Sequence, residues 1–121
     1  MTGPDWQQHE RDIQILLGLD STISSGNKAH DPSDGVDRRH HTESRFPLMV
    51  DAKSTTKKSY SLKRQTLKDW EEKAAAFGNI FAMPLRFEDA EPNELGKRGH
   101  DDYIVINIHD FTTLLEAYRD A

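Results

Sequence analysis

The clearest structural signal in this chain is an apolar run that ends in two opposite charges, Phe46-Pro47-Leu48-Met49-Val50-Asp51-Ala52-Lys53. A short apolar run bounded by polar residues is typical of a buried strand. Side chains two residues apart in a strand point to the same face, so we expect the carboxylate of Asp51 and the ammonium of Lys53 to lie side by side. An isolated Asp-x-Lys is usually a solvated strand end with a weak ion pair, so its meaning depends on the rest of the chain.

A helix and a second strand follow this run. Residues 62–77 carry apolar side chains at helical spacing, and Gly78 follows as a C-cap. Residues 79–87 predict a strand in which Pro84 indicates a sheet edge or a bulge, because proline cannot donate a ladder hydrogen bond. The predicted inward face of the helix consists of Leu62, Leu67, Trp70, Ala74 and Phe77.

The remaining segments continue the alternation of helices and strands. Residues 5–17 predict a helix that stops at Gly18, and residues 103–108 predict another strand. Asp110 is expected to cap a last helix over 111–118. The expected apolar faces of these two helices are Trp6, Ile13, Leu16 and Leu17 in the first and Leu114 and Leu115 in the last.

The order of these elements predicts one α/β domain over residues 1–121, with a central mixed sheet flanked by helices. Short strands are expected within 19–23 and 35–37, and mobile loops over 38–45 and 88–102. The 121 residues are 35% apolar and 31% charged, which allows one modest core.

Composition excludes several classes of protein. The chain has no cysteine, which excludes a disulfide scaffold, a thiolate zinc site, an iron–sulfur cluster and cysteine catalysis. There is no stretch of 18 apolar residues and no signal-peptide pattern, so we expect a soluble, cytoplasmic protein. A Gly-rich phosphate loop and a Gly-x-Ser-x-Gly elbow are also missing, which argues against a nucleotide cofactor and a serine hydrolase.

The charges are unevenly distributed along the chain. The formal net charge is −5, yet residues 53–73 contain seven bases and three acids, whereas residues 88–102 contain six acids and two bases. The basic segment follows Lys53 directly, so we expect it to hold phosphates. The alternative, a merely solvated helix start, is less favoured. Its members nearest the expected strand are Lys57, Lys58, Lys63 and Arg64.

Two further carboxylates accompany the Asp-x-Lys pair. Asp34 precedes a short apolar segment, and Glu10 lies on the first predicted helix. Hydrolysis of a phosphodiester commonly needs a divalent cation held by carboxylates and a positive group near the attacking water. Three carboxylates and a lysine suit Mg²⁺ or Mn²⁺, which prefer oxygen ligands.

The order and spacing of these residues resemble the archaeal-type Holliday junction resolvases of the PD-(D/E)XK nuclease superfamily, small versions of which also occur in phages. The resemblance covers roughly residues 8–87. It rests on Glu10-Arg11, Ser25-Gly26-Asn27-Lys28, Asp34, Val50-Asp51-Ala52-Lys53-Ser54-Thr55, Tyr60, Gln65, Phe77-Gly78, Ala82 and Arg86-Phe87.

The resemblance implies a role for each matching residue. Asp34 and Asp51 would bind the metal, with the carbonyl of Ala52 as a further ligand. Lys53 would orient or help deprotonate the attacking water and offset charge on the phosphate. Glu10 would bind a second metal or its water. Gln65 would support the active site from the start of the second helix, and the DNA backbone would contact Ser25, Lys28 and Ser54.

Two positions depart from the family pattern. Asp51 stands where these resolvases more often carry glutamate, although the superfamily uses either. The first metal-binding aspartate has three candidates, Asp31, Asp34 and Asp37. We prefer Asp34 because it precedes the small apolar pair Gly35-Val36, with Asp37 next, since an aspartate before proline is typical of a turn.

Histidines and tryptophans offer weaker alternatives. His40 and His41, with His30 and His9, are more typical of solvated positions than of metal ligands. Trp70 lies on an apolar helical face and is expected in the core rather than stacked on a base. Trp6 is a possible dimer contact that the sequence leaves undecided.

The sequence therefore predicts a magnesium-dependent endonuclease with a restriction-endonuclease-like core that cuts four-way DNA junctions. A junction has two-fold symmetry, so paired cuts imply a homodimer. A nicking or restriction-type endonuclease with another DNA substrate is one alternative. A DNA-binding module that has lost catalysis is the other. No membrane partner is expected, and the location is the host cytoplasm if the protein is phage-encoded.

Overall fold

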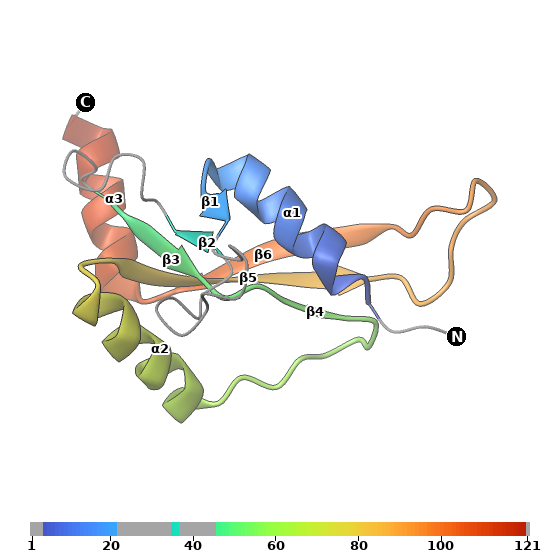
Figure 1. Ribbon diagram of the computed structural model, residues 1–121, viewed down its shortest axis with the longest axis horizontal. Coiled ribbons are helices and arrows are strands. Elements are labelled where there is room, and N and C mark those ends of the chain that lie inside the picture. The colour runs from blue at the N-terminus through green and yellow to red at the C-terminus, as the bar shows by residue number, and fades with distance from the viewer. Residues whose placement is uncertain (1–3, 22–34, 37–45, 121) are drawn as a thin grey trace.

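The computed structural model describes residues 4–21, 35–36 and 46–120 as three helices and one mixed sheet of six strands (Figure 1). The predicted α/β fold with a mixed sheet is confirmed. In chain order the elements are α1 Trp6–Leu17, β1 Asp20–Ser21, β2 Gly35–Val36, β3 Leu48–Val50, β4 Lys53–Thr55, α2 Arg64–Ala76, β5 Ile80–Glu88, β6 His100–Ile106 and α3 Ile108–Asp120.

The long strand β5 organises the sheet. On one edge it pairs in parallel with β3 along its first part and with β4 along its last part. On the other edge it pairs antiparallel with β6 over seven positions. The antiparallel strands β2 and then β1 extend the sheet beyond β3. In Figure 1, β5 and β6 therefore run through the middle of the molecule.

Helices α1 and α2 cover opposite faces of the sheet. Alternate residues of β3 and β5 point to opposite sides, so each helix packs on a different set of these residues. Trp70 stacks on Phe81 with ring centroids 5.6 Å apart, so its predicted core position is confirmed. One core cluster, on the α2 side, contains Met49, Ala74, Phe81 and Met83. The other, on the α1 side, contains Ile13, Leu19, Val50 and Ala82.

The face that α1 buries differs from the prediction. The helix stops at Gly18, as expected, and Gly18 is in the left-handed conformation; Asp5, predicted as its first residue, is instead its N-cap. The buried residues are His9 and Ile13, whereas Trp6 and Leu16 are exposed. Because the sheet beneath α1 offers polar partners to His9 and Asp12, this polar stripe faces inward and part of the apolar face remains in solvent.

The second and third helices are also corrected at their ends. Helix α2 is shorter than predicted, and Leu62 and Phe77 lie outside it with exposed side chains. Helix α3 begins earlier, at Ile108, and none of its residues is buried. The prediction that Leu114 turns inward is wrong. None of the described helices is long and apolar enough to cross a bilayer.

The acidic segment 88–102 is only partly a loop. Strand β5 includes Glu88, and β6 begins at His100, so three residues at the end of that segment belong to the sheet. Asp102 is accommodated in a strand because it lies opposite Arg86 in the register and pairs with its guanidinium. The predicted loop 38–45 lies outside the described residues.

Pro84 lies in the central strand and not at a sheet edge, so that part of the prediction is wrong. It is fully buried and faces Ile104 across the antiparallel pairing with β6. On its other side the parallel pairing stops at Val50 and resumes at Lys53. The missing N–H of proline is therefore accommodated by an interruption between β3 and β4 rather than by exposure.

Candidate functional site

The interruption between β3 and β4 is where the predicted Asp51 and Lys53 lie. Val50 pairs with Ala82 and Lys53 pairs with Leu85, so the register is the same on both sides of the break. Asp51 N still donates to the carbonyl of Ala82 at 3.3 Å. In a continuous parallel ladder the carbonyl of Asp51 would then accept from the N–H of residue 84. Because residue 84 is proline, that donor does not exist, and the ladder breaks at Asp51 and Ala52.

Asp51 and Lys53 form an ion pair at this break. Lys53 Nζ lies 3.2 Å from Asp51 Oδ2. The Asp51 residue is only 7% exposed, whereas the Lys53 side chain is 39% exposed. The contact is a close approach of charges rather than an aligned hydrogen bond, since Asp51 Oδ2 accepts no hydrogen bond of acceptable geometry. A carboxylate this buried is costly without a counter-charge, and its oxygen is suited to a further cation.

A small basic pocket adjoins this ion pair on the α2 side of the sheet. Its volume is about 270 Å³, and its two charged lining residues are Lys53 and Lys63. Three hydroxyl side chains and three apolar ones complete the wall, and no carboxylate lines it. An anion of the size of a phosphate suits such a lining, because both lysines and the hydroxyls donate hydrogen bonds. The uncharged lining residues are Tyr60, Ser61, Thr66, Leu62, Leu67 and Met83.

Helix α1 contributes a buried histidine on the opposite face of the sheet. His9 is 1% exposed, and its Nε2 lies 3.4 Å from the carbonyl of Pro84. A carbonyl only accepts, so Nε2 carries the proton and donates. Burial lowers the pKa of His9, and the carbonyl of Pro84 opposes that shift only in part, so the ring is neutral at pH 7. The other ring nitrogen, Nδ1, is buried without a hydrogen-bond partner.

The structure brings together only part of the predicted site. Asp51, Ala52 and Lys53 lie at the break, and Glu10 is half-buried on α1. Gln65 is exposed on the first turn of α2 and donates to Asp69 Oδ1 at 2.8 Å. Among the described residues, no three His, Asp or Glu side chains form a group that could hold a metal. Several predicted residues lie outside the described part: Asp34, its alternatives Asp31 and Asp37, and the DNA contacts Ser25 and Lys28.

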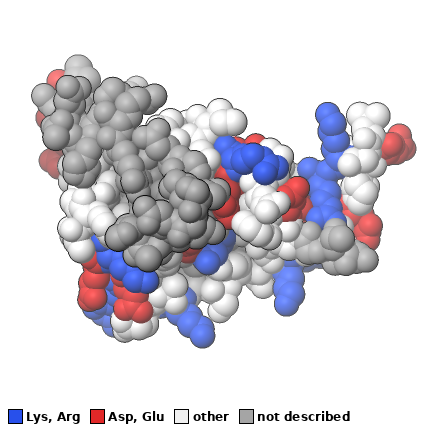
Figure 2. Space-filling view, in the orientation of Figure 1, with Lys and Arg blue, Asp and Glu red and all other residues white. Residues whose placement is uncertain are grey.

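The predicted DNA contacts that are described differ in exposure. Lys57 and Lys58 are exposed in the bend after β4, and Lys63 and Arg64 are exposed at the start of α2. Ser54 has its Oγ buried without a hydrogen-bond partner, so this hydroxyl does not reach the surface. Figure 2 shows Lys and Arg interspersed with Asp and Glu on the face drawn there, over α2 and toward the ends of β5 and β6.

An ionic network around a buried arginine, which the sequence did not reveal, lies beyond His9 on the same face. The Arg86 guanidinium, 3% exposed, donates to Asp102 through Nε and Nη2 at 2.7 and 2.9 Å. Its Nη1 donates to Asp12 Oδ2 at 2.9 Å. Hydrogen bonds from Arg86 lower the pKa of Asp102 against the opposing effect of partial desolvation, and Asp102 in turn raises the pKa of Arg86. The only sequence signal was Arg86 itself, a charge inside an apolar strand.

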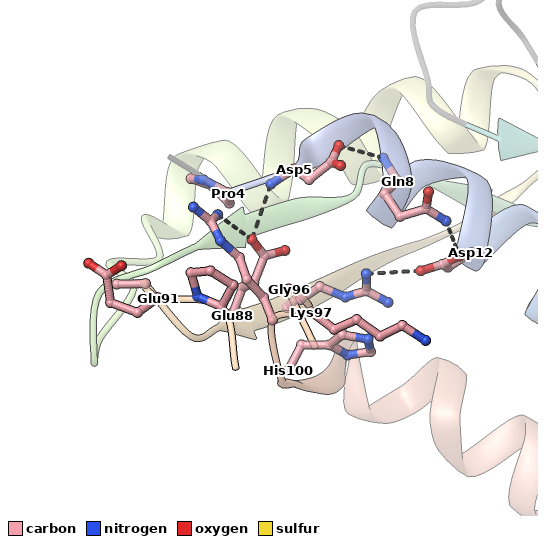
Figure 3. Close-up of a pocket in the computed structure, with 13 residues that line it drawn as sticks. Pro4, Asp5, Gln8, Asp12, Glu88, Glu91, Gly96, Lys97 and His100 are labelled. Carbon is pink, nitrogen blue, oxygen red and sulfur yellow. Dashed lines mark hydrogen bonds and ion pairs between the residues drawn. The ribbon is translucent and has the colours of Figure 1, made fainter. Parts of the chain in front are cut away.

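Asp12 and Arg86 of this network line a pocket of about 1110 Å³ between α1, the end of β5 and the start of β6 (Figure 3). Gln8 and Asp12 reach into it from α1, and His100 reaches into it from β6. Glu88 accepts from Arg98 Nη1 at 2.8 Å. Both acids and bases line the wall, so the pocket has no single sign of charge that would select an anion or a cation.

Comparison with known proteins assigns this chain to no family. No family model, no curated protein and no solved structure matches it.

Proposed function

We propose that this protein is a metal-dependent endonuclease that hydrolyses DNA phosphodiesters, with the four-way junction as its substrate. The observation that supports the proposal is the nearly buried Asp51 carboxylate beside the partly exposed Lys53 ammonium, at a break in a parallel ladder. In a purely structural ion pair, the buried oxygen Asp51 Oδ2 would be expected to accept an aligned hydrogen bond, and it accepts none. An oxygen that binds a metal cation must instead keep its lone pair available. The junction substrate and the restriction-endonuclease-like core are proposed from the resemblance of the residue pattern to the junction resolvases.

Asp34 is the proposed second carboxylate. It precedes Gly35 in the sequence, and Gly35 pairs with Val50, the residue before Asp51. The pairing of Gly35 with Val50 supports Asp34 over Asp31, because Asp34 is the aspartate directly before Gly35 in the sequence. Asp34, Asp51 and the carbonyl of Ala52 would hold Mg²⁺, and Glu10 would bind a second ion or its water. When bound, the metal lowers the pKa of water and polarises the phosphate.

Lys53 is the proposed catalytic residue among the bases. Its ammonium is held against Asp51 and also lines the small basic pocket. It can therefore donate to a phosphate oxygen there, where it offsets the charge that develops as water adds to phosphorus. The P–O ester bond breaks in the same reaction, which leaves one strand end with the phosphate and the other with a hydroxyl. The attacking water loses a proton to solvent, and the leaving oxygen takes a proton from solvent to become that hydroxyl.

The exposed bases after β4 are the proposed DNA contacts. Reversal of both Lys57 and Lys58 to glutamate should weaken junction binding for every sequence tested and reduce the slope of affinity against salt concentration. Fewer phosphate contacts release fewer counterions. Fluorescence anisotropy over a salt series measures both quantities.

Matched reversals in the acidic loop provide the control for that prediction. Glu91 and Glu94 are exposed like Lys57 and Lys58, and their reversal to lysine should leave binding unchanged or stronger. If the Lys57/Lys58 variant keeps both affinity and salt slope, the phosphate contacts lie elsewhere, and Arg38, Arg39 and Arg45 become the next candidates.

A homodimer is part of the proposal, because two symmetric cuts need two active sites. Exposed apolar side chains on α3 support it, since they lie on one helical stripe and contiguous exposed apolar surface is typical of an interface. Sedimentation equilibrium should give twice the chain mass of 13.9 kDa, and Phe111→Glu should return the monomer. A monomeric parent protein would contradict this part. The stripe comprises Ile108, Phe111, Leu114 and Tyr118.

Cleavage of three substrates with and without Mg²⁺ tests the proposed function. A fixed four-way junction should receive symmetric nicks in opposing strands, whereas flap and linear duplex DNA should remain intact. Cleavage of linear or flap DNA instead would favour a nicking or restriction-type endonuclease. Binding to the junction without cleavage in either Mg²⁺ or Mn²⁺ would favour a DNA-binding module that has lost catalysis.

A further inference from the structure

We propose that β6 pairs antiparallel with β6 of a second copy of this chain, with Tyr103 on the two-fold axis, so that the two sheets become one continuous sheet. The inference deepens the homodimer of the proposed function and rests on that function only for its consequence for DNA cleavage. The observations that carry it are the exposed edge of β6 and the register that this strand adopts with an inverted copy of itself.

Strand β6 is the longest edge strand in the described part of the chain. It pairs with β5 over seven positions without a bulge, and it pairs with no other described strand. The other described edge strands, β1 and β4, have two and three residues. Tyr103 and Ile104 of β6 are 60% and 49% exposed. A long, regular and exposed edge is a template for pairing with a further strand.

The hydrogen bonds to β5 determine which backbone groups of β6 point outward. Asp89 N donates to the carbonyl of Gly99 at 2.8 Å, and bonded positions alternate along an antiparallel pair. Every second residue after Gly99 therefore bonds to β5, and the residues between them direct their N–H and C=O groups away from it. The outward groups belong to His100, Asp102, Ile104 and Ile106.

These outward groups match those of the same strand in the reverse direction. Tyr103 is the middle residue of β6, so an axis at Tyr103 pairs the strand over its full length. Across the axis, Asp102 faces Ile104 of the second copy. At the ends of the strand, His100 faces Ile106 of the second copy. All outward N–H and C=O groups of both strands then have hydrogen-bond partners.

The acidic residues of β6 favour this register over its neighbours. Asp102 lies opposite an isoleucine, and Asp101 lies opposite Val105 of the second copy. An axis at Asp101 or at Asp102 would instead place a carboxylate directly opposite its own copy, which destabilises a strand pair. Asp102 is also paired with Arg86 within its own chain, so its charge is already balanced when the second strand arrives.

Helix α3 adds apolar surface at one end of this edge. Strand β6 ends at Ile106 and α3 begins at Ile108, so the exposed apolar stripe of α3 starts beside the strand (Figure 1). The edge of a seven-residue strand measures roughly 24 by 10 Å. That area is well below the roughly 800 Å² that each partner buries in a stable interface. The α3 stripe therefore belongs to the same interface and supplies further buried area.

This register places the two candidate sites on one face of the joined sheet. Lys53 pairs with Leu85, and Leu85 pairs with Tyr103, so the three residues form one row across the sheet. The two-fold axis at Tyr103 continues that row into the second copy. Five strand spacings then separate the two Lys53 residues by about 24 Å across the sheet. Under the proposed function, one junction meets two symmetric sites on the same face.

Single cysteines test the register, because the parent chain contains no cysteine. Residues opposed at a non-hydrogen-bonded position have Cα atoms about 4.5 Å apart, a distance that suits a disulfide. Tyr103→Cys should therefore form a disulfide-linked dimer under mild oxidation, seen by non-reducing electrophoresis. Asp101→Cys is the matched control on the same strand and face. Its two copies lie about 14 Å apart along the strands, so it should remain unlinked.

Proline substitutions at adjacent positions separate the outer edge of β6 from the inner one. Ile104→Pro removes an N–H that points outward, so it should keep the folded circular dichroism spectrum and sediment as a monomer. Val105→Pro removes an N–H that bonds to β5 and should lower Tm markedly. Sedimentation equilibrium compares both with the parent, for which twice the chain mass of 13.9 kDa is expected.

The outcomes separate this inference from the proposed function. A dimeric parent whose Tyr103→Cys variant forms no disulfide overturns the inference, even if Ile104→Pro does not fold. Equal crosslinking of Asp101→Cys also overturns it, as does a folded Ile104→Pro variant that stays dimeric. A monomeric parent overturns both the inference and the homodimer. A dimer that crosslinks through Tyr103→Cys but cleaves no DNA supports the inference and overturns the proposed endonuclease.

Discussion

Asp51→Asn will lower Mg²⁺-dependent junction cleavage by about a hundred-fold or more, because it removes a charged metal ligand while it nearly preserves the shape of the side chain. DNA binding should persist or become tighter, since a carboxylate that repels phosphates is gone. The side chain is nearly buried beside Lys53, so an amide of the same size keeps the packing. Single-turnover cleavage measures the loss, and anisotropy without metal measures the binding.

Lys53→Ala is the companion variant for this prediction. The Lys53 side chain is 39% exposed, so Lys53→Ala should keep the folded circular dichroism spectrum and lose cleavage, with Tm lowered only because Asp51 loses its counter-charge. Cleavage by Asp51→Asn within a few-fold of the parent would contradict the metal-site assignment. Joint loss of fold and cleavage in Lys53→Ala would assign a structural role to the ion pair.

The elements that could be predicted from the sequence are those with a strong local period. The strand that ends at Asp51, the second helix and the long strand β5 all carry apolar residues at regular spacing, and their existence is confirmed. The contact between Asp51 and Lys53 was also predictable, because the register is unchanged across the break and two residues of separation still place both side chains on one face. Element ends were harder, since Leu62 and Phe77 fit the helical pattern and yet lie outside the helix.

The contacts that the sequence could not reveal join distant segments. His9 meets Pro84 across 75 residues, and Asp12 meets Arg86 across 74. Each of these polar residues would be expected at the surface if its own neighbours were the only guide. Pro84 is tolerated in the central strand because the partner strand is interrupted opposite it. The residues next to Pro84 in sequence could not reveal this, because it depends on which strand pairs with β5.

Asp102→Ala will lower the free energy of unfolding by about 3 kcal/mol, because it leaves the buried Arg86 guanidinium without its bidentate partner. Arg86 is 3% exposed and cannot reach solvent instead. This loss of stability lies toward the lower end of the range for broken buried ion pairs, since Asp12 still accepts a hydrogen bond from Arg86 Nη1. Urea denaturation at pH 7, analysed by linear extrapolation, measures the difference.

The double variant Arg86→Met with Asp102→Leu is the control, because it removes both charges and fills the space with apolar atoms. It should be markedly more stable than Asp102→Ala alone.

The pH dependence of stability provides an independent check. Arg86 depresses the pKa of Asp102 in the folded state below the ordinary 3.8, so the ion pair stabilises the fold above that pH and loses its effect as the pH falls through the depressed pKa. The gap between the parent and Asp102→Ala should therefore narrow in acid. If the difference in free energy of unfolding between the parent and Asp102→Ala is small, and is the same at pH 7 and pH 3, then solvent rather than Asp102 balances the charge of Arg86.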